Sequence, residues 1–286
     1  MITGQDSPDH AAPEGDLGRR ARRLAEASVN GLASLTGVRA SPYVAELMGE
    51  DLVSLARYLL SPSARRSERD QAASAHTAEE CFAFAQAHFG VGPVQQMAEI
   101  KGLLDLAQAN GARVVCEIGT RDGGTSVLFS RVLAPDTLVV MDLYAKNRWR
   151  LRSAAPAGQS VHVVDGDSTH PVTVARLRRK LAGRQLDLLL IDGDHGWSGV
   201  RQDFINYREF VREGGLIAFH DICPVTDAEV GRFTGDVPAF WKLISTLYPF
   251  HEFIADTGQQ GLGIGVIDYR RDQPIEPVLV ARTPSE

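Results

Sequence analysis

The stretch that decides the fold reads Val114-Val115-Cys116-Glu117-Ile118-Gly119-Thr120-Arg121-Asp122-Gly123-Gly124-Thr125-Ser126. It begins as a short apolar run of the kind that forms a buried strand, and an acid, Glu117, stands near the end of that run. A glycine-rich turn follows, and then a segment with the character of a helix start. Glycine permits backbone conformations and a close approach that a β-carbon would block. The stretch therefore predicts a strand that leads into a nucleotide-type ligand site.

The chain around this stretch alternates helices and strands. Five β-rich runs predict strands near 113–118, 137–142, 161–165, 186–191 and 215–220. Helical patterns lie before and between them, near 94–109, 123–133, 169–182 and 198–212. Short strands separated by helices predict βαβ units and a parallel sheet. A last helix near 237–247 and two runs near 250–255 and 261–267 predict an antiparallel strand pair at the end of the sheet.

The pattern predicts four parts along the chain. We expect a disordered tail at 1–15, a helical region at 16–90 that serves as a lid or an oligomerisation element, the α/β domain at 93–268 and a C-terminal tail at 269–286. An extra helical arm of this kind could support a homo-oligomer.

Local signals divide the helical region further. Ser41-Pro42 is a helix-start signal, and Thr77 with Glu80 three residues later has the spacing of a capping box. Pro62 to Ala75 is charged and rich in serine and alanine, which predicts a connector between helices.

Composition limits the class of protein. The 286 residues are 44% hydrophobic and 23% charged, as in ordinary globular proteins, and the net charge of −6 provides no electrostatic argument for nucleic acid. Three widely spaced cysteines show no zinc-ligand or disulfide pattern, which fits a reducing compartment. No apolar run approaches the roughly 20 residues of a membrane span, and no signal-peptide core is present. We expect a cytoplasmic protein that binds a small molecule or another protein.

Acids recur directly after the predicted strands. In an open parallel sheet, ligands bind beyond the carboxyl ends of the strands. Asp142 follows the second strand, where a carboxylate can accept hydrogen bonds from both hydroxyls of a ribose. The third strand leads into Asp165-Gly166-Asp167-Ser168, whose polar groups can contact an adenine edge. The fourth leads into Asp192-Gly193-Asp194-His195 and the fifth into His220-Asp221.

A dinucleotide-binding dehydrogenase would also have a glycine turn and an acid about 20 residues later. Two features disfavour it here. The turn reads Gly119-x-x-x-Gly123-Gly124 rather than G-x-G-x-x-G. In addition, Glu117 stands two residues before the first glycine, where an acid is badly placed beside a pyrophosphate. An acid suits a cationic ligand that carries an ammonium and a sulfonium, and this favours S-adenosylmethionine.

Here the chain resembles the class I S-adenosylmethionine-dependent methyltransferases, because the stretch from Glu117 to Thr125 is similar to their first motif. Within that superfamily it resembles the branch that contains cephalosporin hydroxylase-like proteins and macrolide-sugar or rhamnosyl O-methyltransferases. The stretches that carry this likeness are Ile191–His195, Gly214–Ile222 and Gly261–Val266. The resemblance covers about residues 93–268. It implies a Rossmann-like sheet in the order 3-2-1-4-5-7-6, with strand 7 antiparallel.

The resemblance also implies where ligands bind. The cofactor-binding residues that it implies, together with the strand-end pattern, are Glu117, Gly119, Thr120, Gly123, Thr125, Ser126, Asp142, Leu143, Asp167, Ser168, Asp192 and His195. It further implies a divalent metal, usually magnesium, at Asp192, His220 and Asp221. Carboxylates at adjacent strand ends can converge on one hard cation. Imidazole is a poorer magnesium ligand than carboxylate, so manganese, iron and zinc are also possible metals. His220 could instead support the metal ligands without binding the metal, or contact the substrate.

The position of His195, three residues after Asp192, resembles that of the catalytic base in metal-dependent O-methyltransferases. An aliphatic hydroxyl ionises negligibly near neutral pH, whereas a metal lowers its pKa and imidazole can accept its proton. Asp192 and His195 are thus the expected catalytic residues, and Asp192 and Asp221 would hold the metal. The expected reaction is direct transfer of a methyl group to a hydroxyl of a small molecule, such as a sugar on a natural product.

Other functions stay open at this stage. The protein could methylate a nitrogen or a catechol-like phenol. In a different class, it could be a non-catalytic partner subunit that only keeps the cofactor-binding fold. The joint presence of Asp192, His195 and Asp221 argues against this last alternative, because a pure scaffold would not need all three.

Several residues have a structural interpretation beside a functional one. Asp167 either caps the helix that follows it or contacts adenine, and both roles are compatible. Trp197 either packs over the adenine or belongs to the core. Phe240 and Trp241 are predicted either to form an apolar helix face or to line the bottom of the acceptor pocket. Asp203 is predicted to be a surface charge on a helix.

Overall fold

The computed structural model describes residues 42–90, 92–226 and 234–281. The chain divides into two compact units, Met1–Pro62 and Ser63–Glu286. In the first unit the structure describes one helix, α2 (Pro42–Leu60), which begins at the proline of the predicted helix-start signal. The predicted tail at 1–15, the helical pattern that follows it and Ser41 lie outside the described residues. Among the helices that are described, none combines the length and apolar character needed to cross a membrane.

The second unit is built on a seven-stranded sheet in the order β3-β2-β1-β4-β5-β7-β6. Its strands are β1 (Val114–Ile118), β2 (Thr137–Asp142), β3 (Ser160–Asp165), β4 (Leu186–Ile191), β5 (Val211–His220), β6 (Phe250–Phe253) and β7 (Ile264–Asp268). The first five strands run parallel, and β7 is antiparallel to both β5 and β6. The predicted strand order and the antiparallel pair at the end of the sheet are confirmed.

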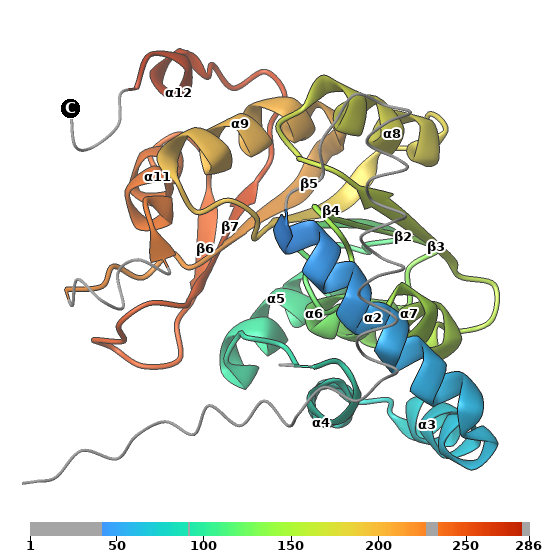
Figure 1. Cartoon of the computed structure of the whole chain (residues 1–286). Coiled ribbons are helices and arrows are strands. Elements are labelled where there is room, and N and C mark those ends of the chain that lie inside the picture. The colour runs from blue at the N-terminus through green and yellow to red at the C-terminus, as the bar shows by residue number, and fades with distance from the viewer. Residues whose placement is uncertain (1–41, 91, 227–233, 282–286) are drawn as a thin grey trace, which may run out of the picture. The chain divides into compact units, whose positions relative to one another are not determined.

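Helices cover both faces of this sheet (Figure 1). One face carries α3 (Pro62–Ser74), α4 (Ala78–His88), α5 (Met97–Ala109), α6 (Gly124–Leu128) with a π-helical turn at Phe129–Leu133, and α7 (Arg148–Ala154). The other face carries α8 (Pro171–Leu181), α9 (Trp197–Tyr207), α11 (Val237–Ile244) and α12 (Glu276–Val280). Successive side chains of a strand point to opposite faces of the sheet. Cys116 therefore packs with the helices on one face, and Val115 packs with those on the other.

Helix α3 corrects the prediction of a connector at 62–75. Its sequence is rich in alanine and arginine, which have high helix propensity, whereas its charge and its serines predict a loop. Tertiary contacts hold it in place. Arg150 Nε donates to Glu68 at 2.7 Å, Arg69 donates to Ser153 at 3.2 Å, and Ala72 is buried in the core.

Several helices differ from the predicted pattern. Helices α7 and α12 lie where no helix was predicted, and both are short enough that their periodicity is weak. The helix predicted to reach 212 ends at Tyr207, and a 3₁₀ turn at Arg208–Phe210 leads into β5. The first compact unit ends at Pro62, so α3 from Ser63 onward and the whole of α4 belong to the unit that contains the sheet. The role of residues 16–90 stays a prediction.

Two local signals are confirmed. Thr77 Oγ1 accepts a hydrogen bond from the Glu80 backbone at 3.2 Å, and Glu80 Oε2 accepts one from the Thr77 backbone at 3.0 Å, which is a complete capping box at the start of α4. Helix α5 ends at Ala109, directly before the predicted stop, and Gly111 has a φ of +73°.

The segments that follow β1 and β4 are in close contact at Gly119. The Asp192 backbone N–H donates to the Ile118 carbonyl at 2.9 Å, which carries the pairing of β1 and β4 beyond the last strand residues. Gly119 has a φ of +88°, and a β-carbon added there would lie 1.8 Å from the carbonyl oxygen of Asp192. Only glycine therefore fits between the first turn and the end of β4.

Gly119→Ala is expected to lower the free energy of unfolding by about 3 kcal/mol or more, because the backbone must shift to relieve this contact. Gly158 is a matched control, since its φ is +86° and nothing lies within 4 Å of a β-carbon added there. Gly158→Ala should lower the free energy of unfolding by only about 1–2 kcal/mol, which is the cost of a left-handed backbone conformation in a residue with a β-carbon. Urea denaturation measures both values. Equal losses in the two variants would show that contact with Asp192 is not the cause.

Candidate functional site

The carboxyl ends of the five parallel strands lie in one row. The residue pairs that set this register are Ile118–Met141, Ile118–Ile191, Asp142–Asp165 and Ile191–Phe219. The polar segments that follow the strands therefore begin at the same edge of the sheet. This is the edge at which an open parallel sheet binds its ligands.

Hydroxyl groups support the glycine turn between β1 and α6. Ser126 Oγ donates a hydrogen bond to Glu117 and lies 2.5 Å from Thr120 Oγ1. All three side chains are buried. Gly123 has a φ of +89°, so this turn also needs the left-handed conformation that glycine adopts easily. The turn thus holds an acid inside a small hydroxyl-lined site at the end of β1.

Glu117 binds its proton more tightly than an ordinary glutamate. Its pKa is raised to about 8, chiefly by burial and also by the carboxylates of Asp192 and Asp142, while the hydrogen bonds with Ser126 and Thr120 lower it. Its ionised form therefore needs a positive partner. A cationic group bound nearby would lower this pKa again.

Asp142 joins the end of β2 to the glycine turn. Its Oδ2 accepts a hydrogen bond from the Arg121 backbone at 2.7 Å, and its Oδ1 accepts one from the Tyr144 backbone at 3.3 Å. Burial raises the pKa of Asp142, while these backbone hydrogen bonds lower it. The next residue, Leu143, is exposed.

The loop after β3 is held by Arg148 and by its own side chains. Arg148 donates to both oxygens of Asp165, at 2.7 and 2.9 Å. Asp167 Oδ1 accepts from the backbone and the hydroxyl of Thr169, at 2.8 and 2.7 Å. Helix α8 is instead capped by His170, whose Nδ1 accepts a backbone hydrogen bond at 3.2 Å. The predicted helix cap at Asp167 is therefore wrong, and its contact with adenine stays a prediction.

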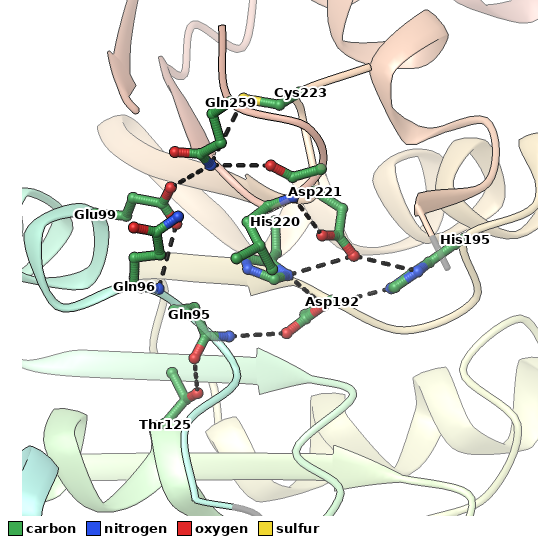
Figure 2. Close-up of polar contacts among 12 residues, drawn as sticks. Gln95, Gln96, Glu99, Thr125, Asp192, His195, His220, Asp221, Cys223 and Gln259 are labelled. Carbon is green, nitrogen blue, oxygen red and sulfur yellow. Dashed lines mark hydrogen bonds and ion pairs between the residues drawn. The ribbon is translucent and has the colours of Figure 1, made fainter. Parts of the chain in front are cut away.

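Two histidines and two aspartates meet at the ends of β4 and β5 (Figure 2). Asp192 Oδ1 lies 3.2 Å from His220 Nδ1 and 3.4 Å from His195 Nε2. Asp221 Oδ2 lies 3.4 Å from His195 Nδ1 and 3.5 Å from His220 Nδ1. Asp221 has a φ of +62°, and its Oδ1 accepts a hydrogen bond from the Leu262 backbone at 3.1 Å. Each imidazole thus stands between two carboxylates.

Charge pairing governs the protonation of this cluster. Burial alone would raise the pKa of Asp192, but the charge of His220 and hydrogen bonds from His195 and His220 bring it down to about 2. Burial lowers the pKa of His220, and the paired carboxylates overcome this and raise it well above its ordinary value. The side chain of His220 is only 2% exposed, whereas that of His195 is 28% exposed. His195 is therefore the histidine that a bound molecule can reach.

The donor set fits a divalent cation. Asp192, His195 and Asp221 each offer one ligand atom, and these atoms lie within 4.8 Å of one another. His195 uses Nε2 towards Asp192 and Nδ1 towards Asp221, each at 3.4 Å, and one ion can bind only one of these two nitrogens. Two carboxylates suit magnesium or manganese, and the imidazole also admits iron or zinc. His220 stands beside this trio, and its buried Nε2 has no hydrogen-bond partner among the described residues.

Gln95 is a site residue for which the sequence offered no signal. It lies in the segment before α5, donates from Nε2 to Asp192 Oδ2 at 3.1 Å and accepts from Thr125 Oγ1 at 2.6 Å. A single glutamine outside any motif cannot be assigned to a site from spacing alone. Arg148 was missed for the same reason, because its partner Asp165 identifies it only in the folded chain.

Asp203 is a correction to the predicted surface charge. It is 0% exposed, and burial raises its pKa to about 7. A signal was present, because Val200, Phe204 and Tyr207 form the apolar face of α9 at helical spacing and Asp203 lies on the same face.

The aromatic residues near the site belong to the core. Trp197 packs edge-on against Phe240 with ring centroids 5.8 Å apart, and Trp241 donates from Nε1 to Glu252 at 2.6 Å. All three rings are buried in the cluster beneath β4 and β5. The structural interpretation of these residues is confirmed.

Comparison with known proteins agrees with this geometry. Residues 116–222 match the family model of a methyltransferase domain, a range that begins in β1 and ends just after His220 and Asp221. No curated protein sequence matches the chain. Residues 116–222, which include the glycine turn and the carboxyl ends of the first five strands, are therefore similar to a methyltransferase domain.

Solved structures with a similar fold are themselves described as methyltransferases. An O-methyltransferase from Bacillus cereus in complex with SAH has 20% identity and a TM-score of 0.48, over 67% of this chain and 90% of that one. TomG from Streptomyces achromogenes, an O-methyltransferase involved in tomaymycin synthesis, has 17% identity and a TM-score of 0.49, over 68% and 89%. MycE from the mycinamycin biosynthetic pathway, in complex with Mg and SAH, has 16% identity and a TM-score of 0.42, over 60% and 50%.

The raised pKa of Glu117 predicts a pH dependence of stability. Its folded-state pKa is about 8 and its ordinary value is 4.5, so between these values the folded protein holds a proton that the unfolded chain has released. The free energy of unfolding of the ligand-free protein should therefore fall as pH rises from about 5 to about 8.

Glu117→Gln should flatten that profile by about 1 kcal/mol or more over the same pH range, because glutamine has no proton to lose. Urea denaturation of both proteins at three pH values measures the difference. Parallel profiles would mean that Glu117 is ionised in the folded protein throughout.

Proposed function

We propose that the chain is a divalent-cation-dependent O-methyltransferase that acts on a hydroxyl group of a small molecule, such as a sugar on a natural product. One observation carries the proposal. Asp192, His195 and Asp221 converge at the ends of β4 and β5, within a methyltransferase domain and next to its glycine turn. A protein that only bound the cofactor would have no use for this trio.

Glu117 and Asp142 are the proposed contacts of the cofactor. The sulfonium and ammonium of S-adenosylmethionine are cations, and they would favour the ionised form of a glutamate whose pKa is raised to about 8. Asp142 stands at the end of β2, where its carboxylate can also accept hydrogen bonds from ribose hydroxyls. The turn residues from Gly119 to Ser126 and the loop residues Asp167 and Ser168 complete the proposed cofactor site.

Asp192 and Asp221 are the proposed cation ligands. When bound, a divalent cation lowers the pKa of a hydroxyl and fixes the orientation of the acceptor. The two carboxylates come from adjacent parallel strands, so the sheet itself sets their separation. Gln95 and the Leu262 backbone hold the outer oxygen of each carboxylate, and the inner oxygens face the imidazoles.

His195 is the proposed general base. Its ring nitrogens lie 3.4 Å from Asp192 and 3.4 Å from Asp221, so the imidazolium formed when it takes a proton is stabilised by both carboxylates. His220 is too deeply buried to reach an acceptor, and its charge instead compensates the two acids. The likeness to macrolide-sugar and rhamnosyl O-methyltransferases supports a sugar hydroxyl as the acceptor.

The proposal predicts binding of both the cofactor and the cation. Titration calorimetry of the protein with S-adenosylmethionine, and separately with Mn²⁺ or Mg²⁺, should detect both. Asp192→Asn should weaken cation binding by about tenfold or more, because it removes the charge of one ligand. Asp105→Asn, at an exposed surface pair on α5, is the control and should bind as the unmodified protein does. Cofactor binding without cation binding would favour a metal-free enzyme or a non-catalytic subunit.

His195→Gln should lower kcat by about 10²–10⁴-fold, with most of the effect in kcat rather than in cofactor affinity. Formation of S-adenosylhomocysteine with a panel of sugars, catechols and amines measures turnover and distinguishes oxygen from nitrogen acceptors. His251→Gln, at a partly exposed position on β6, is the matched control. An unchanged kcat in His195→Gln would rule out its role as the base.

A further inference from the structure

Gln95 connects the glycine turn to the histidine–aspartate cluster (Figure 2). Its amide accepts a hydrogen bond from Thr125 Oγ1 at 2.6 Å and donates one to Asp192 Oδ2 at 3.1 Å. Thr125 lies in the first turn of α6, directly after the glycine turn, and Asp192 lies directly after β4. One side chain thus spans the space between the proposed cofactor site and the proposed cation site.

The chemistry of its partners fixes the orientation of this amide. An aspartate carboxylate only accepts hydrogen bonds, so the group that faces Asp192 must be the NH₂ of Gln95. The amide oxygen then faces Thr125, whose hydroxyl donates to it. Gln95 is 4% exposed, so water does not replace either contact. Rotation of the amide would break both hydrogen bonds at once.

The contact restricts Asp192 to one ligand oxygen. Because Oδ2 is held by Gln95, Oδ1 is the atom that faces His220 at 3.2 Å and His195 at 3.4 Å. Without Gln95 the partly buried Oδ2 would lose this donor, and the carboxylate would be free to turn and share both oxygens with the imidazoles. Gln95 therefore sets which atom Asp192 presents to a cation.

The segment that carries Gln95 also packs tightly on the glycine turn. A β-carbon added at Gly124 would lie 2.4 Å from the Gly92 carbonyl carbon and 2.5 Å from the Pro93 nitrogen. A shift of the turn on cofactor binding is therefore transmitted to Gln95 by direct backbone contact and through Thr125.

We propose that Gln95 is a positioning residue that couples the two sites, so that cofactor and divalent cation each bind more tightly when the other is present. The proposal rests on the proposed function, because it requires that both ligands bind. Coupling between two binding sites is reciprocal, so it can be measured from either ligand.

Titration calorimetry with S-adenosylhomocysteine, in the absence and presence of saturating Mn²⁺, tests the proposal without any turnover. In the unmodified protein Mn²⁺ should tighten binding of S-adenosylhomocysteine by about fivefold or more, as is typical of allosteric coupling. Electron paramagnetic resonance of free Mn²⁺ measures Mn²⁺ binding, and S-adenosylhomocysteine should tighten that binding by the same factor. In Gln95→Met, which keeps the length of the side chain, the factor should fall towards one while both ligands still bind.

Two control pairs separate coupling from a general structural effect. Gln96→Met makes the same substitution one residue further on, away from Asp192, and should keep the factor. Thr125→Val removes the hydroxyl that donates to Gln95 and should reduce the factor, whereas Thr125→Ser retains the hydroxyl and should restore it. The threonine pair decides the question if Gln95→Met fails to fold.

The outcomes distinguish this inference from the proposed function. An unchanged factor in Gln95→Met, or in Thr125→Val, overturns the role of Gln95. Independent binding of the two ligands to the unmodified protein overturns the coupling and leaves the proposed function standing. If Mn²⁺ does not bind to the unmodified protein at all, the cation requirement of the proposed function is wrong, and the coupling is wrong with it.

Discussion

The site depends on the close contact between β1 and β4 at their carboxyl ends. Gly119 follows β1 in a left-handed conformation, and the space beside it is filled by the carbonyl of Asp192. This contact brings the glycine turn and the histidine–aspartate cluster together, although about seventy residues separate them in the chain. The pairing of Ile191 with Phe219 then adds His220 and Asp221 from the next strand.

At this edge of the sheet, burial raises the pKa values of the acids and positively charged neighbours lower them. Among the described residues no positive charge lowers the pKa of Glu117, and burial raises it to about 8. Asp192 is 14% exposed, and two histidines bring its pKa down to about 2. One acid is thus poised to respond to a cationic ligand, whereas the other is already ionised and available to a cation. Two acids on neighbouring strands acquire different chemistry because their partners differ.

Much of the fold was predictable because its signals are local. The β-rich runs and the glycine turn predicted the five parallel strands to within a few residues, and β4 begins and ends where the pattern placed it. Helix α3 was not predicted, because a polar helix lacks strong periodicity and is stabilised by contacts such as Arg150 with Glu68. Asp203 was misjudged because a charge was given more weight than the apolar face on which it lies.

The sequence by itself determined the strands, the turn between β1 and α6 and the acids that follow each strand, because these depend on neighbouring residues and on a period of two or 3.6. Only the tertiary structure decided that His195 and His220 each stand between two carboxylates, that His170 rather than Asp167 caps α8, and that Gln95 joins Thr125 to Asp192. Those contacts link residues from separate strands and loops, and their distances exist only after the sheet has brought the strand ends together.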